Sequence, residues 1–392
     1  MQSSDIPDKF AIPFANNAGA GFIRNIPQLP TGVTGQASLT EGFPPANFNP
    51  AGAGGVPPFG QDFNGLLKQM SSWNRWAATG SFPPYDPAWQ AAVNGYPLGS
   101  IVQSLVEFGL LWVSIVEGNL TNPDTGGAGW FVWSRIVTAN TDLYVNGATG
   151  NDNNNGKSPA TALATPQGAI NKAFSYPPSQ FNITIHIADG TYAPCATPGY
   201  SGPTIIMDGN SGSPQNVIVN NPSGAAHCIL VTGPNVLTCK NLTVTNSGSL
   251  AAGGFVAAGA GTMNTQNTRS GLISSGSVFE SYGGGIVNIN GNHTFAGNAQ
   301  EWFWSLFGGV MNIATGITLT ASGSLTTNIT CLVQQLGILT MGPPNASFAG
   351  TPLASGQRFS VQTNGVVNVN GGGANVFPGA SAGSTATGGQ YN

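Results

Sequence analysis

A motif that recurs near the C-terminal end of the chain constrains its fold more than any other feature. The segments GIVNING, GVMNIATG, GILTMG and GVVNVNG share one order: glycine, two apolar residues, Asn or Thr, and another apolar residue. Their fourth positions are Asn288, Asn312, Thr340 and Asn368, at intervals of 24, 28 and 28 residues. A strand-containing repeat of this length without alternating helices indicates a β-solenoid, in which each coil buries apolar side chains against its neighbours.

The chain between residues 183 and 378 keeps this character, with short Val, Ile, Leu and Thr strands separated by Asn and Gly, which we expect at the corners. Because stacked strands lie about 4.8 Å apart, about seven or eight coils would form a rod roughly 35 Å long. A β-sandwich is the competing fold, but the hairpin and alternation signals that it requires are weaker here. The predicted fold is mostly β, with a parallel β-helix over 141–378 and a Gly-rich tail over 379–392.

The segment from Asp142 to Phe174 precedes these repeats and has the features of a cap. It contains a short apolar strand, a turn rich in Asn, Gly and Asp, and then Thr165-Pro166, which together favour the start of a helix. Apolar residues at helical spacing follow, namely Ala169, Ile170, Ala173 and Phe174. A solenoid exposes its core at the first coil, so we predict that this helix covers it.

The N-terminal part of the chain has a different composition. Residues 1–60 are rich in Pro, Gly, Asn and Phe, which predicts an extended arm that packs on a partner or on neighbouring chains, with a loosely ordered arm as the alternative. Residues 61–140 predict one helix, with Asp62 as its N-cap and Gly80 at its end, followed by a small β module. One face of the helix is apolar, with Phe63, Leu66, Leu67, Met70, Trp73, Trp76 and Ala77.

Charge is unusually scarce. Only 6% of the residues are Asp, Glu, Lys or Arg, against about 25% in a typical soluble protein, and the net charge is −4. Without a Lys or Arg cluster, nucleic acid is not an expected partner, and without an apolar run of about 20 residues we expect no membrane insertion. The start of the chain shows no export signal. The cysteines Cys195, Cys228, Cys239 and Cys331 lack any metal-site or disulfide pattern, so we expect buried, reduced thiols and neither metal nor cofactor.

Acidic residues are the main candidates for chemistry. Beyond Asp142, the acids are Asp152, Asp189, Asp208, Glu280 and Glu301. We expect the three aspartates to accept hydrogen bonds from backbone N–H groups in turns. Glu280 and Glu301 lie close to one coil apart, but Glu280 is 8 residues before Asn288 and Glu301 is 11 before Asn312. A glycosidase holds its two carboxyls about 5 to 10 Å apart, and this phase difference of three residues argues against such a pair.

Two tryptophans follow Glu301 directly. In a strand, Trp302 and Trp304 point to the same side, and on an outward face they would form a platform for sugar rings, with Glu301 accepting hydroxyl hydrogen bonds. Burial in the core or between chains is the alternative. The histidines His186, His227 and His293 are far apart in the sequence, and we expect core or corner positions for them.

Several segments resemble a known group of proteins. LYVNGATGNDNNNGKSPATALATPQGAI and IHIADGTY resemble the entry into the right-handed parallel β-helix of pectate-lyase-like proteins, a fold common in bacteriophage tailspikes. IPFANNAGAGFIRNIP, GFPPANFNPAGAGGVPPFGQDFNGLLKQMSSWNRW and FPGASAGSTATGGQY are similar to segments of bacteriophage tail fibre and tailspike proteins. The resemblance covers both ends and the middle of the chain.

The resemblance implies a homotrimeric tail fibre or tailspike, assembled in the host cytoplasm and carried on the tail of the virion. Its N-terminal region would dock on phage tail or adaptor proteins, and its β-helix would bind a host surface polysaccharide or receptor. The docking candidates are then Phe63, Leu66, Leu67, Met70, Trp73 and Trp76. The alternatives are a depolymerase that cleaves capsule or O-antigen with Glu280 and Glu301, and a purely architectural tail component.

Overall fold

The computed structural model describes residues 8–135, 137, 139–350 and 355–392. The chain divides into two compact units, Met1–Trp133 and Ser134–Asn392. Each unit is built differently, the first around one long helix and a small sheet, the second almost entirely from parallel strands.

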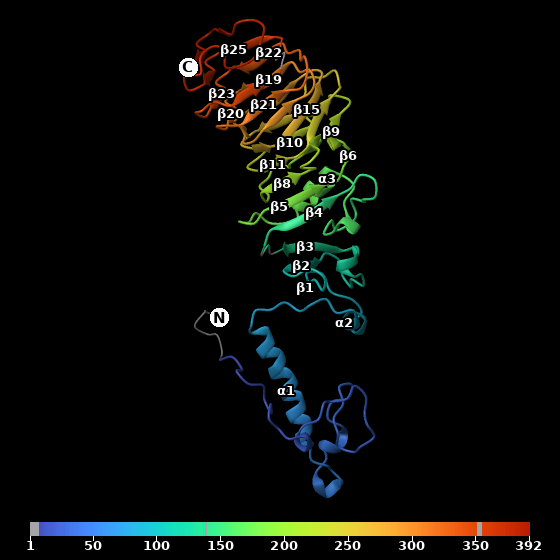
Figure 1. Cartoon of the computed structure of the whole chain (residues 1–392). Coiled ribbons are helices and arrows are strands. Elements are labelled where there is room, and N and C mark those ends of the chain that lie inside the picture. Colours follow the sequence, from blue (N-terminus) through green and yellow to red (C-terminus); the bar gives the residue numbers. More distant parts are fainter. Residues whose placement is uncertain (1–7, 136, 138, 351–354) are drawn as a thin grey trace. The chain divides into compact units, whose positions relative to one another are not determined.

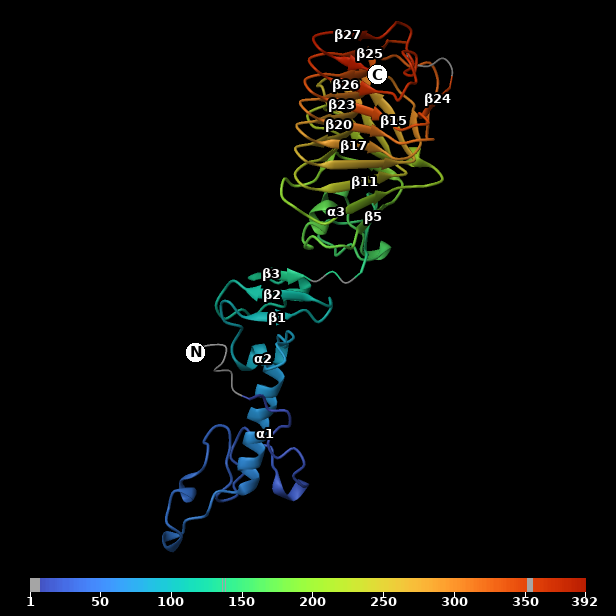
Figure 2. The same ribbon diagram turned by 90° about the vertical axis from the view of Figure 1, so that its left-hand side faces the viewer.

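The second unit is a parallel β-solenoid with three sheets of ten, eight and seven strands (Figures 1 and 2). β4 and β5 pair directly in one sheet, and from β5 onward strands adjacent in sequence lie in different sheets. Strands of successive coils pair in parallel. This confirms the parallel β-solenoid predicted from the repeat.

The ten-stranded sheet contains β4 (Thr141–Val145), β5 (Ile183–Ile187), β8 (Ile205–Asp208), β11 (Val236–Lys240), β14 (Thr262–Gln266), β17 (Ile286–Ile289), β20 (Val310–Ile313), β23 (Ile338–Met341), β26 (Val366–Asn368) and β28 (Gln390–Tyr391). The eight-stranded sheet contains β7 (Cys195–Ala196), β10 (Ile229–Val231), β13 (Phe255–Ala258), β16 (Ser277–Tyr282), β19 (Glu301–Leu306), β22 (Ile329–Val333), β25 (Gln357–Val361) and β27 (Ser384–Thr385). The seven-stranded sheet contains β6 (Gly190–Tyr192), β9 (Val217–Asn221), β12 (Thr243–Asn246), β15 (Thr268–Ile273), β18 (His293–Phe295), β21 (Thr318–Ala321) and β24 (Ser347–Ala349).

The repeat motif sets the register of the ten-stranded sheet. Asn288 pairs with Asn312, Asn312 with Thr340, and Thr340 with Asn368. These residues lie within strands, not at corners as expected, and their amides form a ladder. Asn288 Nδ2 donates to Asn264 Oδ1, and Asn312 Nδ2 donates to Asn288 Oδ1, each over 2.9 Å. The side-chain amides of one row therefore bond to each other along the solenoid. These bonds satisfy the polar atoms of Asn on a strand face that has no charged partner for them.

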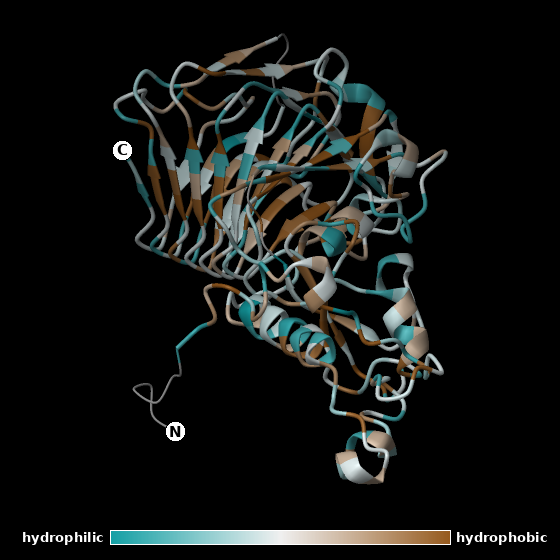
Figure 3. Ribbon diagram, turned by 90° about the horizontal axis from the view of Figure 1, so that it is seen from below, coloured by the Kyte–Doolittle hydropathy of each residue, from teal (hydrophilic) through white to brown (hydrophobic). Residues whose placement is uncertain are grey.

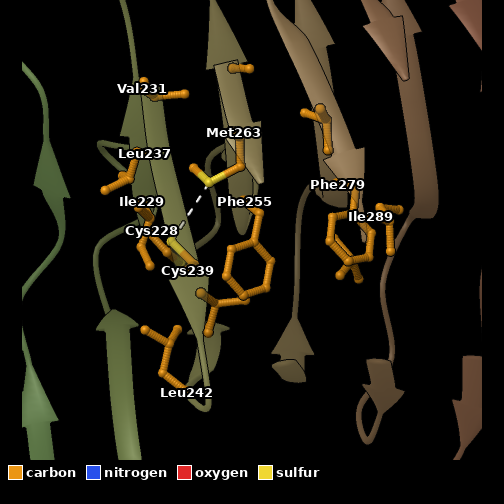
Figure 4. Close-up of a cluster of buried hydrophobic side chains, with 14 of the residues drawn as sticks. Cys228, Ile229, Val231, Leu237, Cys239, Leu242, Phe255, Met263, Phe279 and Ile289 are labelled. Atoms are coloured by element: carbon orange, nitrogen blue, oxygen red, sulfur yellow. Dashed lines mark hydrogen bonds between the residues drawn. The ribbon is translucent and has the colours of Figure 1, made fainter. Parts of the chain in front are cut away.

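The interior of the solenoid is one continuous apolar cluster. Much of the hydrophobic colouring in Figure 3 lies on the strands. Side chains from successive coils stack on each other: the rings of Phe255 and Phe279 have centroids 5.5 Å apart, and Cys239 Sγ lies 3.6 Å from Met263 Sδ (Figure 4). All four cysteines are free and buried, as predicted, and behave as small apolar core residues.

The start of the solenoid is capped by α3 (Pro166–Ala173), as predicted. Thr165 Oγ1 accepts a hydrogen bond from the Gly168 N–H over 2.9 Å, and Ala169, Ile170 and Ala173 are buried in the core cluster. The Asp152 carboxylate fixes the approach to this helix, because it accepts hydrogen bonds from the Ala164 and Thr165 N–H groups.

The first unit contains α1 (Gly60–Ala77), α2 (Pro87–Ala92) and a three-stranded sheet of β1 (Ile101–Gln103), β2 (Leu110–Ser114) and β3 (Trp130–Arg135). Short 3-10 turns over 20–22, 45–47 and 51–53 interrupt the segment before α1. The helix begins three residues earlier than predicted, and Asp62 is not its N-cap. Its buried carboxylate instead binds the Arg24 guanidinium over 2.6 Å and the Ala37 N–H over 2.7 Å.

Candidate functional site

Glu280 and Glu301 lie on neighbouring strands of the eight-stranded sheet. Glu301 on β19 pairs with Ser277 on β16, and Glu280 lies three positions further along, opposite Trp304. The phase difference predicted from the sequence is therefore present. Adjacent strands lie about 4.8 Å apart and three residues span about 10 Å, so the two backbone positions are roughly 11 Å apart.

The Glu280 side chain is turned back along its own strand. Ser277 Oγ–H donates to Glu280 Oε2 over 3.3 Å, which directs the Glu280 carboxylate back toward the level of Glu301. The charge of Glu280 is felt at Glu301, where it adds to the effect of burial in raising the pKa. The two glutamates that the sequence nominated thus lie on adjacent strands and interact electrostatically, despite their difference in phase.

Both carboxyls are shielded from water and titrate near neutral pH. Glu280 is 7% exposed and Glu301 is 8% exposed. Burial raises the pKa of Glu280 to about 7, against the lowering effect of the Ser277 hydrogen bond. Burial and then the Glu280 charge raise the pKa of Glu301 to about 7 as well. A carboxyl that holds a proton near pH 7 can act as a general acid.

His227 borders the pair but does not supply a positive charge. Its Nδ1 accepts a hydrogen bond from the Gly253 N–H over 2.9 Å and lies 3.9 Å from Glu280 Oε2. Because Nδ1 is an acceptor, the ring is neutral in this arrangement, and burial lowers the pKa of His227 further from its usual value. Two acids without a cation between them favour retention of a proton by one of them at neutral pH.

Gly253 and Tyr282 complete the surroundings of Glu280. A Cβ atom at Gly253 would lie 2.7 Å from Glu280 Oε2 and 2.6 Å from Val256 Cγ2, so only glycine lets the loop approach this closely. The ring centroid of Tyr282 lies 6.1 Å from that of His227, and burial followed by the Glu280 charge raises its pKa. Tyr282 was missed, although it follows Glu280 by two residues and so shares its strand face. His227 and Gly253 carry no local sequence signal for this position.

The two tryptophans do not form the predicted platform. Trp302 is fully buried and stacks on Phe295, with ring centroids 3.8 Å apart and planes 4° from parallel. The reason is a bend at the start of the strand: Trp302 and Phe303 are consecutive, yet both are buried in the core. The preceding coil repeats the bend with Val278 and Phe279.

Trp304 alone remains a candidate for contact with a ligand. It is half-buried, lies in register with Glu280, and its Nε1–H has no hydrogen-bond partner within the described residues. The ring therefore lies next to Glu280, while its Nε1 atom is buried. Aromatic ring faces suit sugar rings.

The other acids and histidines have different surroundings. Asp189 accepts from the side-chain amides of Asn210 and Asn216, and Asp208 from that of Asn241, so neither has the predicted backbone partner among the hydrogen bonds of the described residues. His293 is in the core, as expected. The prediction for His186 was wrong, because its side chain is 42% exposed and bonds Asp142 Oδ1 over 2.9 Å.

The docking candidates on α1 are largely uncovered. Phe63, Leu67, Met70 and Trp73 are exposed, while Leu66 and Trp76 are half-buried. The buried residues of α1 are instead Asp62, Gly65 and Ser71. The apolar face is available to a partner, and its docking on a virion stays a prediction.

Comparison with known proteins gave no identification: no family model, no curated protein and no solved structure matches the chain. Within the described ranges, no group of three or more His, Cys, Asp or Glu side chains is arranged to hold a metal ion. Among the described helices, none is long and apolar enough to cross a bilayer.

Proposed function

We propose that this protein is a bacteriophage tail fibre or tailspike whose solenoid binds a bacterial surface polysaccharide and cleaves its glycosidic bonds. The observation that carries the catalytic part is the buried Glu280–Glu301 pair on adjacent strands, with both carboxyls titrating near pH 7. Glycosidases use two carboxyls, one as a protonated acid and one as a charged base or nucleophile.

The surroundings of the two carboxyls assign their roles. The Ser277 hydrogen bond favours the charged form of Glu280, whereas the Glu280 charge favours the protonated form of Glu301. In the proposed reaction, Glu301 therefore protonates the leaving glycosidic oxygen. Glu280 acts as the charged partner, and the half-buried Trp304 ring, in register with Glu280, supports a sugar.

The placement in a phage tail rests on the resemblance of both ends of the chain to tail proteins. It includes a right-handed β-helix, an extended N-terminal arm, a homotrimer, and docking of the N-terminal region on a tail or adaptor protein. The low charge fits this proposal, because chains packed side by side bury faces that suit Gly, Ser, Thr and Asn. Antibodies against the chain should label the tail in electron micrographs of virions, and unlabelled tails would remove this assignment.

Binding without cleavage is the second candidate. The observation that favours it is the row of Asn and Thr side chains in register along the ten-stranded sheet, namely Thr238, Asn264, Asn288, Asn312, Thr340 and Asn368. A regular row of neutral amides and hydroxyls suits the hydroxyl groups of an extended polysaccharide. Such a surface would bind the polysaccharide without cleaving it.

The decisive experiment is to incubate the full chain with a panel of capsular polysaccharides and O-antigens, and to measure both binding and new reducing ends. The variants Glu280→Gln and Glu301→Gln keep the side-chain shape and remove the titration, and Glu41→Gln is the control because Glu41 is exposed. We expect cleavage by the wild type and the control, with loss of cleavage but retained binding in both site variants. Binding without released ends would favour adhesion, and cleavage that survives both substitutions would rule out the pair.

A further inference from the structure

Helix α1 carries an apolar seam with the spacing of a coiled coil. Phe63, Leu66, Met70, Trp73 and Ala77 are separated by three, four, three and four residues. These are the a and d positions of two successive heptads, the spacing that keeps a seam facing a partner helix. At 1.5 Å per residue the seam is about 21 Å long.

The N-terminal segment holds α1 mainly through the small and polar residues of the helix. Ser71 Oγ accepts a hydrogen bond from the Phe14 N–H over 2.8 Å, and Asp62 binds Arg24. At Gly65 the contact is so close that a Cβ atom would lie 1.8 Å from the Arg24 carbonyl oxygen. Small and polar residues are thus covered by the chain itself. Of the seam, Phe63 packs on the Phe43 ring, with centroids 4.8 Å apart, while Met70 and Trp73 are more than half exposed.

The exposure of the seam is unusual for residues of this type. Phe63 is 44% exposed, Met70 54% and Trp73 59%. The indole of Trp76 packs against Trp73 edge-on, with ring centroids 5.6 Å apart, but leaves more than half of Trp73 open. A contiguous apolar row of this kind on a soluble domain marks an interaction surface.

We propose that the seam of α1 packs against α1 of a second copy of this chain. Between Phe63 and Ala77, the positions that flank the seam are Leu67, Gln69, Asn74 and Trp76, none of which is charged. Asp62 flanks the seam just before Phe63, but it is buried and paired with Arg24, so two identical helices meet without repulsion. The charged residues Lys68 and Arg75 lie seven residues apart, at the heptad position farthest from the seam. Coiled-coil pairing requires a heptad seam on both helices. A second copy of α1 carries the same seam as the first.

The chain offers a direct test by disulfide trapping. Its four native thiols are buried, and burial raises the pKa of Cys195 and Cys228 to about 12, so an introduced surface cysteine reacts alone. Met70 is the midpoint of the seam and meets its counterpart whether the helices run parallel or antiparallel. Arg75→Cys is the control, because Arg75 is exposed on the same helix but away from the seam.

Under mild oxidation of the full chain, we expect Met70→Cys to form a covalent pair on a non-reducing gel at least about tenfold faster than Arg75→Cys. We also expect the Met70→Glu variant to show weaker self-association than Arg75→Glu in sedimentation experiments. Equal crosslinking rates, or a wild type that sediments as a monomer at micromolar concentration, would overturn the proposal and leave the seam to a different tail protein. Polysaccharide cleavage is measured separately, so loss of the seam contact and failure of the catalytic proposal are distinguishable.

Discussion

The carboxyl pair predicts a specific dependence of stability on pH. The pKa of Glu280 is about 7 in the folded protein and 4.5 for a free glutamate, so between these values the folded state binds the proton more tightly than the unfolded state does. Stability from this group is therefore fully present below pH 4.5 and is lost as the pH rises through 7. At 1.36 kcal/mol per pH unit of pKa difference, the loss is about 3 kcal/mol.

Glu301 contributes in the same direction, since its pKa is also about 7. The two contributions are not additive, because the Glu280 charge is one cause of the raised pKa of Glu301. Replacing Glu280 with Gln removes its own titration and relieves part of that at Glu301. We therefore expect Glu280→Gln to gain about 3 kcal/mol relative to the wild type between pH 4.5 and pH 8, with most of the gain between pH 5 and 7.

Equilibrium unfolding in urea, followed by far-ultraviolet circular dichroism at several pH values, measures this difference. Buried histidines have the opposite pH dependence: burial and the Arg269 charge lower the pKa of His293 to about 3, so its contribution grows as the pH rises toward 6.5. That contribution is common to both proteins and cancels in the difference. The exposed Glu41→Gln control should follow the wild type. If the curves for wild type and Glu280→Gln stay parallel from pH 4.5 to 8, the carboxyl pair is not buried as described.

Three further outcomes are expected. Trp302→Ala should lower the free energy of unfolding by about 3–5 kcal/mol in the same urea assay, since it empties a fully buried aromatic site; a loss below about 1 kcal/mol would contradict the core position. Asp62→Ala should destabilise the first unit by about 1–3 kcal/mol and speed limited proteolysis before α1, because the Arg24 guanidinium and the Ala37 N–H lose their acceptor; unchanged cleavage would contradict that contact. The four cysteines should not react with a thiol reagent in the native protein at pH 8 but should all react in urea, and rapid native labelling would contradict their burial.

The solenoid was predictable because its information is periodic. The spacing of Asn288, Asn312, Thr340 and Asn368 fixes which residues meet in successive strands, and the structure pairs these same positions. The helical cap was predictable for a similar reason, since Thr165, Pro166 and the apolar residues after them are a local signal. The Asn residues were predicted at corners, whereas several lie within strands. Composition alone does not show that Asn side chains of successive coils can bond one another.

The site was only partly predictable. Glu280 and Glu301 were nominated by the scarcity of acids, but their separation depends on side-chain directions that the sequence pattern does not specify. Alternation placed Trp302 and Trp304 on the same side of a strand without fixing which side, whereas the structure buries Trp302 in the core and leaves Trp304 half-buried. Asp62 was drawn away from capping by Arg24, 38 residues earlier, and His227 reaches Glu280 only through the coiling of the chain.

The energetics of the pair argue for a function at this site. The chain has 14 acidic residues in all, and two of them occupy neighbouring buried positions where the described residues give neither a Lys nor an Arg partner. A glutamine at either position would keep the side-chain shape and avoid a cost of about 3 kcal/mol at pH 8. The Gln variants are expected to be more stable than the wild type at pH 8 and to lose cleavage. That result would show that the two acids lower the stability of the fold and are kept for activity, a trade-off known from other active sites.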